Sequence, residues 1–120
     1  MKYSWIDEYC LTKKGCEKDY KEEWGATRYM LCGKMFALRG EDKNGNPIIT
    51  LKLEPSYGAQ LRMEYADITP GYYMNKLHWN SVLLDGTVPK PLLMEMIDES
   101  YQILLHSLPK KVQQTFTEAM

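Results

Sequence analysis

Apolar residues near the start of the chain recur at helical spacing. Trp5, Ile6, Tyr9 and Cys10 follow one another at intervals of one, three and one residues, which predicts a short helix with one apolar face. Ser4 favours a helix N-terminus at this point, because a serine hydroxyl can accept a hydrogen bond from a free amide of the first turn. The aromatic residues of this face are therefore expected in the core.

The pattern of the next segment changes from helical to strand spacing. Residues 16–25 are highly charged and predict a loop with a short, exposed strand. Over residues 27–53 the apolar residues recur with a period of two, which predicts three strands. Turns are expected at Gly33 and at Asn44-Gly45, where residues that tolerate positive φ favour a hairpin. Three strands with short connections predict an antiparallel meander.

The second half of the chain predicts a helix, further strands and a longer helix. Pro55 suits a first helical turn, because its missing N–H has no partner to lose there. This helix is expected to end before a break at residues 69–71, and strands are predicted at residues 72–74 and 79–84. After Pro89, apolar residues recur at three and four, which predicts the clearest helix of the chain, followed by a short last helix.

The order of these elements predicts an α+β fold. We expect a two-layer arrangement in the order α-β-β-β-α-β-β-α, with helices packed on one face of an antiparallel sheet. A chain of 120 residues suits a single domain, residues 1–120, that can bury a core without disulfides or metal.

Composition and charge limit the partners and the cellular compartment that we expect for this protein. Fifteen Lys and Arg oppose sixteen Asp and Glu, so the net charge of −1 does not indicate a strongly basic nucleic-acid-binding protein. Three cysteines without a C-x-x-C pair predict a reducing compartment, and so a cytoplasmic protein. Acidic residues occupy the place of a signal peptide's apolar segment, and the apolar runs are too short for a membrane span. No membrane partner is expected.

No pattern of residues marks a catalytic or metal site. A metal site needs a cluster of ligands, and the chain has only His78 and His106 with no cysteine pair at ligand spacing. Cys32 is expected to be a small buried apolar residue rather than a nucleophile. We therefore predict no catalytic residue, no metal and no other cofactor.

The densest set of polar and aromatic residues lies between residues 67 and 86. Lys76 is a donor that can meet a phosphate, and His78 gains charge below neutral pH. Flat aromatic side chains can stack on a base or pack against a partner, and they form a predicted aromatic surface of Tyr72, Tyr73 and Trp79. Structural roles remain open: Trp79 as a core residue, Asn75 as a turn residue and His78 as a buried, hydrogen-bonded side chain.

The same stretch carries a family resemblance. The sequence P-G-Y-Y-M-N-K-L-H-W-N-S-V-L-L-D-G of residues 70–86 resembles the signature of the MmcQ/YjbR family of small bacterial proteins. G-K-M-F-A at residues 33–37, A-x-L-R at 59–62, D-x-S-Y at 98–101 and L-P-K-K at 108–111 stand in the family's order. The resemblance covers nearly the whole chain.

The resemblance implies an α+β fold and a non-enzymatic role in binding double-stranded DNA through β-hairpin wings. The wings would be the hairpins at Gly33 and Asn44-Gly45, and the signature and the preceding helix would add further contacts. The residues so implied in nucleic-acid contact are Lys34, Arg39, Lys43, Arg62, Asn75, Lys76 and His78. A protein with few phosphate contacts should bind weakly and lose affinity quickly with salt.

The alternative is a protein-interaction or small-ligand module with no role on nucleic acid. In that case Tyr72, Tyr73 and Trp79 would line a pocket or an interface. The distribution of positive charge around the hairpins separates the two hypotheses.

Overall fold

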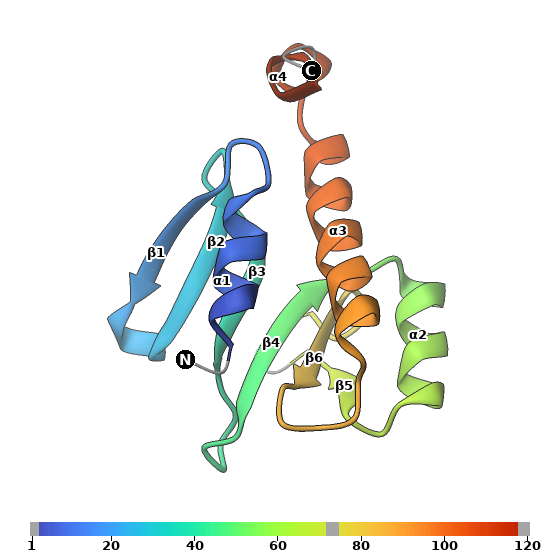
Figure 1. Cartoon of the computed structure of the whole chain (residues 1–120). Helices are drawn as coiled ribbons and strands as arrows, with labels where there is room; N and C mark the ends of the chain where they lie inside the picture. Colours follow the sequence, from blue (N-terminus) through green and yellow to red (C-terminus); the bar gives the residue numbers. More distant parts are fainter. Residues whose placement is uncertain (1–2, 72–74, 118–120) are drawn as a thin grey trace.

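The chain folds around one antiparallel sheet that is covered by helices. In a computed structural model, residues 3–71 and 75–117 are described. Within them, six strands pair in the order β1-β2-β3-β4-β6-β5 (Figure 1). The bounds are α1 Ser4–Leu11, β1 Glu17–Lys21, the 3-10 helix η1 Glu22–Trp24, β2 Ala26–Leu31, β3 Lys34–Glu41, β4 Pro47–Lys52, α2 Pro55–Glu64, β5 Ile68–Pro70, β6 Trp79–Leu83, α3 Lys90–Ser107 and α4 Lys110–Thr117.

This architecture confirms the α+β class and the predicted order of elements. The short strand expected in residues 16–25 is β1, and it forms an edge of the sheet beside β2. The short last helix is α4, which stands at the end of α3 in Figure 1. Among the described helices, none is both long and apolar enough to cross a bilayer.

The two faces of the sheet differ in what covers them. Side chains of directly paired residues in antiparallel strands point to the same side of a sheet. One such buried row contacts the helices, and we call its side the helix face: Tyr29, Ala37, Leu51 and Asn80. The neighbouring row points away from the helices, and we call its side the far face: Arg28, Leu38, Thr50 and Ser81.

Helix α3 supplies the largest part of the core. It lies across β3 and β4 (Figure 1), and its buried positions follow the predicted spacing of three and four. The Tyr101 ring meets the Phe36 ring edge-on, with centroids 5.3 Å apart and planes at 83°. Each fully buried large apolar side chain contributes about 1.5–3 kcal/mol to the free energy of folding, so this layer carries much of the stability.

A β-bulge in β3 adapts the sheet to α3. Tyr29 pairs with Ala37, but Met30 pairs with Met35, so Phe36 is an extra residue in the ladder. Strict alternation would place Phe36 and Ala37 on opposite faces. The bulge leaves both side chains fully buried, which is why Phe36 can reach α3.

Three local predictions need correction or fall outside the described residues. The first helix begins at Ser4 itself, so Ser4 is not the cap; the cap position is Tyr3, which makes no side-chain capping bond. Residues 69–71 are not a break, because Ile68–Pro70 forms β5. β5 is an edge strand, and an edge tolerates a proline without an N–H. The strand predicted at residues 72–74 lies outside the described residues.

Candidate functional site

The signature stretch forms the β5–β6 edge of the sheet. Trp79 begins β6 and is half-buried on the far face, because its neighbour Asn80 points to the helix face. A Cβ atom at Gly71 would lie 2.6 Å from the Trp79 Cβ and 2.9 Å from its carbonyl oxygen. The Gly71 amide donates to that carbonyl oxygen at 2.6 Å. Glycine is therefore required at residue 71 for β5 to approach Trp79, which gives Trp79 a structural role.

The two ends of the stretch are bound to each other. The Asp67 Oδ2 atom accepts hydrogen bonds from the Thr87 amide at 2.7 Å and from the Thr87 hydroxyl at 2.9 Å. A Cβ atom at Gly86 would collide with the Asp67 carboxylate, so the D-G turn needs its glycine. The hydrogen bonds from Thr87 lower the pKa of Asp67 and keep it ionised at neutral pH. Asp67, Gly86 and Thr87 thus connect the segment before β5 to the turn after β6.

The Asn75–His78 turn holds the polar candidates of the signature. Asn75 and Lys76 are exposed, and His78 is half-buried. The Asn75 Oδ1 atom accepts from the Leu77 amide at 2.9 Å, so Asn75 shapes the turn. The Leu53 amide donates to the His78 carbonyl oxygen at 2.8 Å and attaches the turn to β4. Lys76 makes no ion pair or hydrogen bond within residues 3–71 and 75–117, so its ammonium group remains available to an external anion.

The predicted aromatic surface is only partly described. Tyr72 and Tyr73 lie outside the described residues, and Trp79 lies beside Lys52 on the far face. A further aromatic side chain, Trp24, was not singled out from the sequence and is 54% exposed.

Trp24 and its basic neighbours form an exposed group beside β1 and β2, which we call the Trp24 cluster. The Lys21 Nζ and Arg28 Cζ atoms each lie 5.8 Å from the Trp24 ring centroid, within the range of cation–π attraction. Arg28 also binds the Asp19 carboxylate through two nitrogens, at 2.8 and 2.5 Å. The signal in the sequence was a tryptophan within a run of charged residues, which is a poor environment for a core residue.

Arg62 is engaged in a contact between α2 and β6. Its guanidinium donates to the Oδ1 atom of Asn80, which is fully buried. A Cβ atom at Gly58 would lie 3.0 Å from the Asn80 Nδ2 atom and 3.2 Å from the Arg62 Nη1 atom. Gly58, Arg62 and Asn80 therefore lock α2 to the helix face, and Arg62 is not part of a surface with Lys76.

Arg39 is likewise engaged on the helix face. Its Nε atom donates to the Tyr29 hydroxyl at 3.3 Å, and that hydroxyl donates to the Asp7 carboxylate at 2.8 Å. Lys18 completes the group with an ion pair to Asp7 at 2.9 Å. Burial alone would raise the pKa of Asp7, but hydrogen bonds from Lys18 and Tyr29 outweigh it and leave the pKa below its usual range. Arg39 thus helps to bind α1 to the sheet.

Lys34 and Lys43 lie at opposite ends of β3. Both are exposed, Lys34 after the β2–β3 turn and Lys43 in the β3–β4 turn. β3 has eight residues, which at roughly 3.3 Å each gives a length of about 25 Å. The two predicted wings therefore project from opposite ends of the sheet, and they do not form one adjacent pair.

The β2–β3 turn holds the exposed cysteine. Cys32 has a φ of 52° and Gly33 a φ of 78°, so both central residues of this tight turn are left-handed. Cys32 was predicted to be buried, and this is wrong, because the turn directs it to solvent.

A groove lies on the far face near the β3–β4 turn. Its volume is about 260 Å³, and Ser81 and Leu83 of β6 contribute to it. The residues that line it are Asp42, Lys43, Asn44, Asn46, Ile48, Ala66, Asp67, Thr69, Pro70, Ser81 and Leu83. Asp42 and Asp67 both have lowered pKa values, Asp42 chiefly through hydrogen bonds from the Asn46 and Asn44 amides. The groove therefore carries two ionised carboxylates beside a single lysine.

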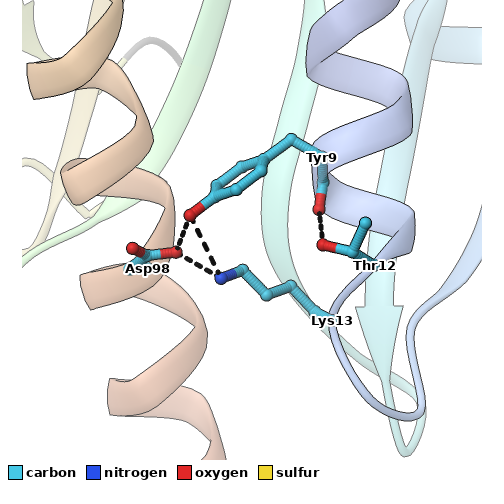
Figure 2. A network of polar contacts seen from close by, with 4 residues as sticks. All are labelled: Tyr9, Thr12, Lys13 and Asp98. Carbon is cyan, nitrogen blue, oxygen red and sulfur yellow. Dashed lines mark hydrogen bonds and ion pairs between the residues drawn. The ribbon is translucent and has the colours of Figure 1, made fainter.

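The first residue of the D-x-S-Y motif connects α3 to α1. In Figure 2 the Tyr9 and Lys13 side chains converge on Asp98. The Tyr9 hydroxyl donates to Asp98 at 2.6 Å, and the Lys13 ammonium forms an ion pair with the same oxygen. Burial disfavours the charge on Lys13, yet the hydrogen bond and attraction to Asp98 raise its pKa overall. The pKa of Tyr9 is also raised, first by burial and then by Asp98.

Ser100 and Tyr101 complete the motif and bind two other parts of the fold. The buried Ser100 hydroxyl donates to the Phe36 carbonyl oxygen at 2.5 Å and accepts from the Lys52 amide at 2.9 Å. These two backbone groups lie just beyond the paired residues of β3 and β4, so the serine replaces the missing ladder bonds. The Tyr101 hydroxyl donates to the Lys14 carbonyl oxygen at 2.5 Å.

The described residues offer no metal cluster and no activated thiol. Across residues 3–71 and 75–117, no three His, Cys, Asp or Glu side chains are grouped so that they could hold a metal ion. Burial raises the pKa of Cys10 to about 12 and that of Cys16 to about 11, so both thiols stay protonated at neutral pH.

Three further exposed lysines lie outside the predicted set. Lys14 ends the α1 side of the α1–β1 loop, and Lys110 and Lys111 begin α4. The signal was present in the sequence as the L-P-K-K motif, which was recognised for its family likeness and not for its charge.

Comparison with known proteins places this arrangement among related chains. A family model described as YjbR matches residues 11–103. The uncharacterized protein YjbR of Escherichia coli K12 is 33% identical over 111 residues, which cover 92% of this chain and 93% of that protein. The uncharacterized protein YyaQ of Bacillus subtilis is 35% identical over 65 residues, 53% of this chain and 54% of that protein.

Solved structures share the fold. The crystal structure of the Deinococcus radiodurans protein DR2400, a DUF419 domain, superposes with a TM-score of 0.84 at 26% identity, covering 92% of this chain and 84% of that one. A crystal structure of a Pseudomonas syringae protein gives a TM-score of 0.75 at 25% identity, covering 86% of this chain and 98% of that one.

Proposed function

The chain belongs to the YjbR family, and we propose that it is a non-enzymatic protein of the bacterial cytoplasm that binds double-stranded DNA. The observation that carries the proposal is the far face of the sheet. In the described part of the chain, α1, α2 and α3 all contact the opposite side, through Asp7, Arg62 and Ser100. The far face is therefore not covered by these three helices, although Thr50 and Ser81 on it are buried, and it has a hairpin turn at either end of β3 (Figure 1).

The groups on and around the far face suit a polyanion with stacked bases. The Trp24 cluster offers an exposed aromatic ring with two cations beside it. Lys52 lies on the same face, paired in register with Trp79. Aromatic rings contribute to nucleic-acid binding through stacking, and lysines through phosphate contacts. Ion pairs such as Arg28–Asp19 neutralise part of the positive charge around the far face, which predicts weak binding.

Five of the residues implied by the resemblance remain as proposed contacts. They are exposed or half-buried and lie in or directly beside turns: Lys34, Lys43, Asn75, Lys76 and His78. We assign Arg39 and Arg62 to the fold instead, because their guanidinium groups are bound to Tyr29 and Asn80 on the helix face.

The length of β3 sets the footprint of the proposed complex. Lys34 and Lys43 are separated by about 25 Å of strand, and phosphates of one DNA strand follow one another every ~3.4 Å along the helix axis. The two turns would therefore contact phosphates about seven base pairs apart. A rigid duplex can bridge that span, whereas a flexible single strand would have to be held in place at both ends.

The alternative of a small-ligand module is represented by the groove beside Lys43. Its volume of about 260 Å³ is below the roughly 300–1,000 Å³ of typical ligand pockets. Among the described residues, its lining also lacks an aromatic side chain. For these reasons we favour the duplex.

Fluorescence anisotropy with a labelled random duplex of about 20 base pairs tests the proposal. We expect saturable binding at about 50 mM salt and a steep loss of affinity as salt rises. Each lysine–phosphate contact contributes about 0.9 to the slope of log K against log salt, so Lys43→Gln/Lys76→Gln should flatten the slope by about two units. Absence of binding to the duplex at low salt would refute the proposal. Tighter binding to an RNA duplex of equal length would refute the choice of DNA.

A further inference from the structure

Positive charge gathers at one end of the molecule from segments that are distant in the sequence. We call the exposed residues Lys14, Lys34, Lys110 and Lys111 the lysine end. In Figure 1 the α1–β1 loop and the β2–β3 turn lie at the upper end of the sheet, and α4 stands above them at the upper end of α3.

Contacts between apolar and backbone groups hold these segments together. A Cβ atom at Gly15 would collide with the Phe116 ring of α4 and lie 2.8 Å from the Leu31 Cδ1 atom of β2. Leu31 is in turn paired with Lys34 across the β2–β3 turn. The Tyr101 hydroxyl fixes the Lys14 carbonyl oxygen at 2.5 Å. The three segments that carry the lysine end are therefore joined through the packed residues Gly15, Leu31 and Phe116.

The lysines of this surface differ from others in the chain by having no anionic partner. Lys13 is bound to Asp98, Lys18 to Asp7 and Lys21 to Glu23. None of the four side chains of the lysine end makes an ion pair or hydrogen bond with another of the residues that the structure describes. Glu17 lies three residues after Lys14, at the start of β1. Against this one carboxylate, the four lysines give a clear excess of positive charge.

A role in stabilising α4 does not explain why Lys110 and Lys111 stand at the start of this helix. Lys110 and Lys111 occupy its first turn, where the helix dipole disfavours cations. Residues placed against a local preference without an internal contact are frequent at functional sites. An external anion would offset the unfavourable position of both ammonium groups.

The opposite end of β3 has the reverse charge. Glu41 ends β3 there, Asp42 follows it, and Asp67 lines the groove beside Lys43. Hydrogen bonds from backbone amides keep Asp42 and Asp67 ionised, so carboxylates surround the only lysine among the groove residues. A phosphate near Lys43 would be repelled by both aspartates, which does not happen near Lys34.

We infer that the lysine end is the principal phosphate-binding surface of the protein, and that a DNA duplex is held there by Lys14, Lys34, Lys110 and Lys111. This inference rests on the proposed function and makes it more specific. Of the two hairpin turns, the β2–β3 turn, together with α4, then carries the larger share of the affinity, and the β3–β4 turn carries the smaller share.

Two double variants of equal charge test the inference by anisotropy on the same duplex. Lys110→Gln/Lys111→Gln removes two charges from the lysine end. Lys18→Gln/Lys90→Gln removes two charges elsewhere, from Lys18 paired with Asp7 and from Lys90 above the Trp5 ring. We expect the first variant to flatten the slope of log K against log salt by about two units and the control to leave it unchanged. Between about 50 and 200 mM salt, the wild-type affinity should then fall about tenfold further than that of the first variant.

The outcomes separate the inference from the proposed function. If the wild-type protein binds no duplex, the proposed function fails and the inference fails with it. If the wild type binds, but Lys110→Gln/Lys111→Gln has the salt slope of the control, only the inference is overturned. A larger loss for Lys43→Gln/Lys76→Gln than for the lysine-end variant would overturn it as well.

Discussion

Two motifs in the last quarter of the chain differ in whether their polar side chains bind other parts of the fold. In D-x-S-Y, at residues 98–101, Asp98, Ser100 and Tyr101 each bind a different part of the fold. In L-P-K-K, at residues 108–111, Leu108 is buried, but the two lysines are exposed and bind none of the described residues. Both motifs are part of the family resemblance of the sequence, yet one is explained by folding and the other is not.

This difference separates the residues of a family signature that are required for folding from those that are available for function. Gly71 and Gly86 permit close approaches that a Cβ atom would block, and Asp67, just before the signature, accepts a hydrogen bond from Thr87. Such residues are required for the fold whatever the protein binds. Function is better sought in polar side chains that the fold leaves unused, as in Lys76 and the lysine end.

Loss of the Ser100 hydroxyl should give the largest loss of stability. Ser100→Ala leaves the Phe36 carbonyl and the Lys52 amide without their partner in a buried environment. An unsatisfied buried polar group destabilises a protein by about 1–3 kcal/mol, so two should lower the free energy of unfolding by about 3 kcal/mol. Urea titration followed by circular dichroism measures this.

Ser107→Ala is the matched control on the same helix. The Ser107 side chain is exposed, and its hydroxyl only returns to the Leu104 carbonyl oxygen. Its replacement should change the free energy of unfolding by less than about 0.5 kcal/mol. Equal effects of the two substitutions would show that Ser100 has no special role in joining β3 to β4.

Gly58→Ala should be destabilising although it improves helix propensity. Alanine in a helix interior is normally more stable than glycine by about 1 kcal/mol. Here the new methyl group would press on the Asn80 and Arg62 side chains at 3.0–3.2 Å. Such overpacking opposes the propensity gain, and we expect a net loss of about 1–2 kcal/mol. Ala59→Gly, at the exposed neighbouring residue, should lose about 1 kcal/mol through propensity alone.

A stabilising effect of Gly58→Ala would contradict this account. It would mean that Asn80 and Arg62 move aside easily, and that the contact between α2 and β6 is loose. Arg62 would then be available to a partner, as the family resemblance implied.

Hydrophobic periodicity was enough to predict the α+β class, the order of the elements and the buried face of α3. It could not predict the bulge at Phe36, because a bulge depends on pairing with β2 and on the helix above it. It also could not show that Arg39 and Arg62 lie on the helix face, since their partners Tyr29 and Asn80 are 10 and 18 residues away. The gathering of charge at the lysine end could not be predicted either, because its four lysines come from three separate segments.

Asp98→Asn should give a smaller and pH-dependent loss. Its contacts with Tyr9 and Lys13 are partly exposed, so we expect about 0.5–1 kcal/mol at neutral pH. The folded protein raises the pKa of Lys13 above its ordinary 10.5 and that of Tyr9 above 10.0. Raised values stabilise the fold at pH below the unfolded values, and this contribution is lost as pH rises through the folded ones.

The pH dependence gives the measurement a second readout. Urea midpoints of the wild type and of Asp98→Asn should differ most between about pH 7 and 9 and should converge above about pH 10.5. A difference that stays constant up to pH 11 would indicate that Asp98 acts through packing and not through its contacts with Lys13 and Tyr9.

Charge reversal in the L-P-K-K motif should have the smallest effect on stability, and of the opposite sign. Lys110→Glu/Lys111→Glu places acids in the first turn of α4, where the helix dipole favours them by a few tenths of a kcal/mol each. We expect the free energy of unfolding to stay equal or to rise by up to about 0.5 kcal/mol, as measured by urea titration. A fall of more than about 1 kcal/mol would mean that these lysines serve the fold after all. If stability holds while duplex binding is lost, the two lysines differ from Ser100 in kind, because affinity and stability then depend on separate residues of neighbouring motifs.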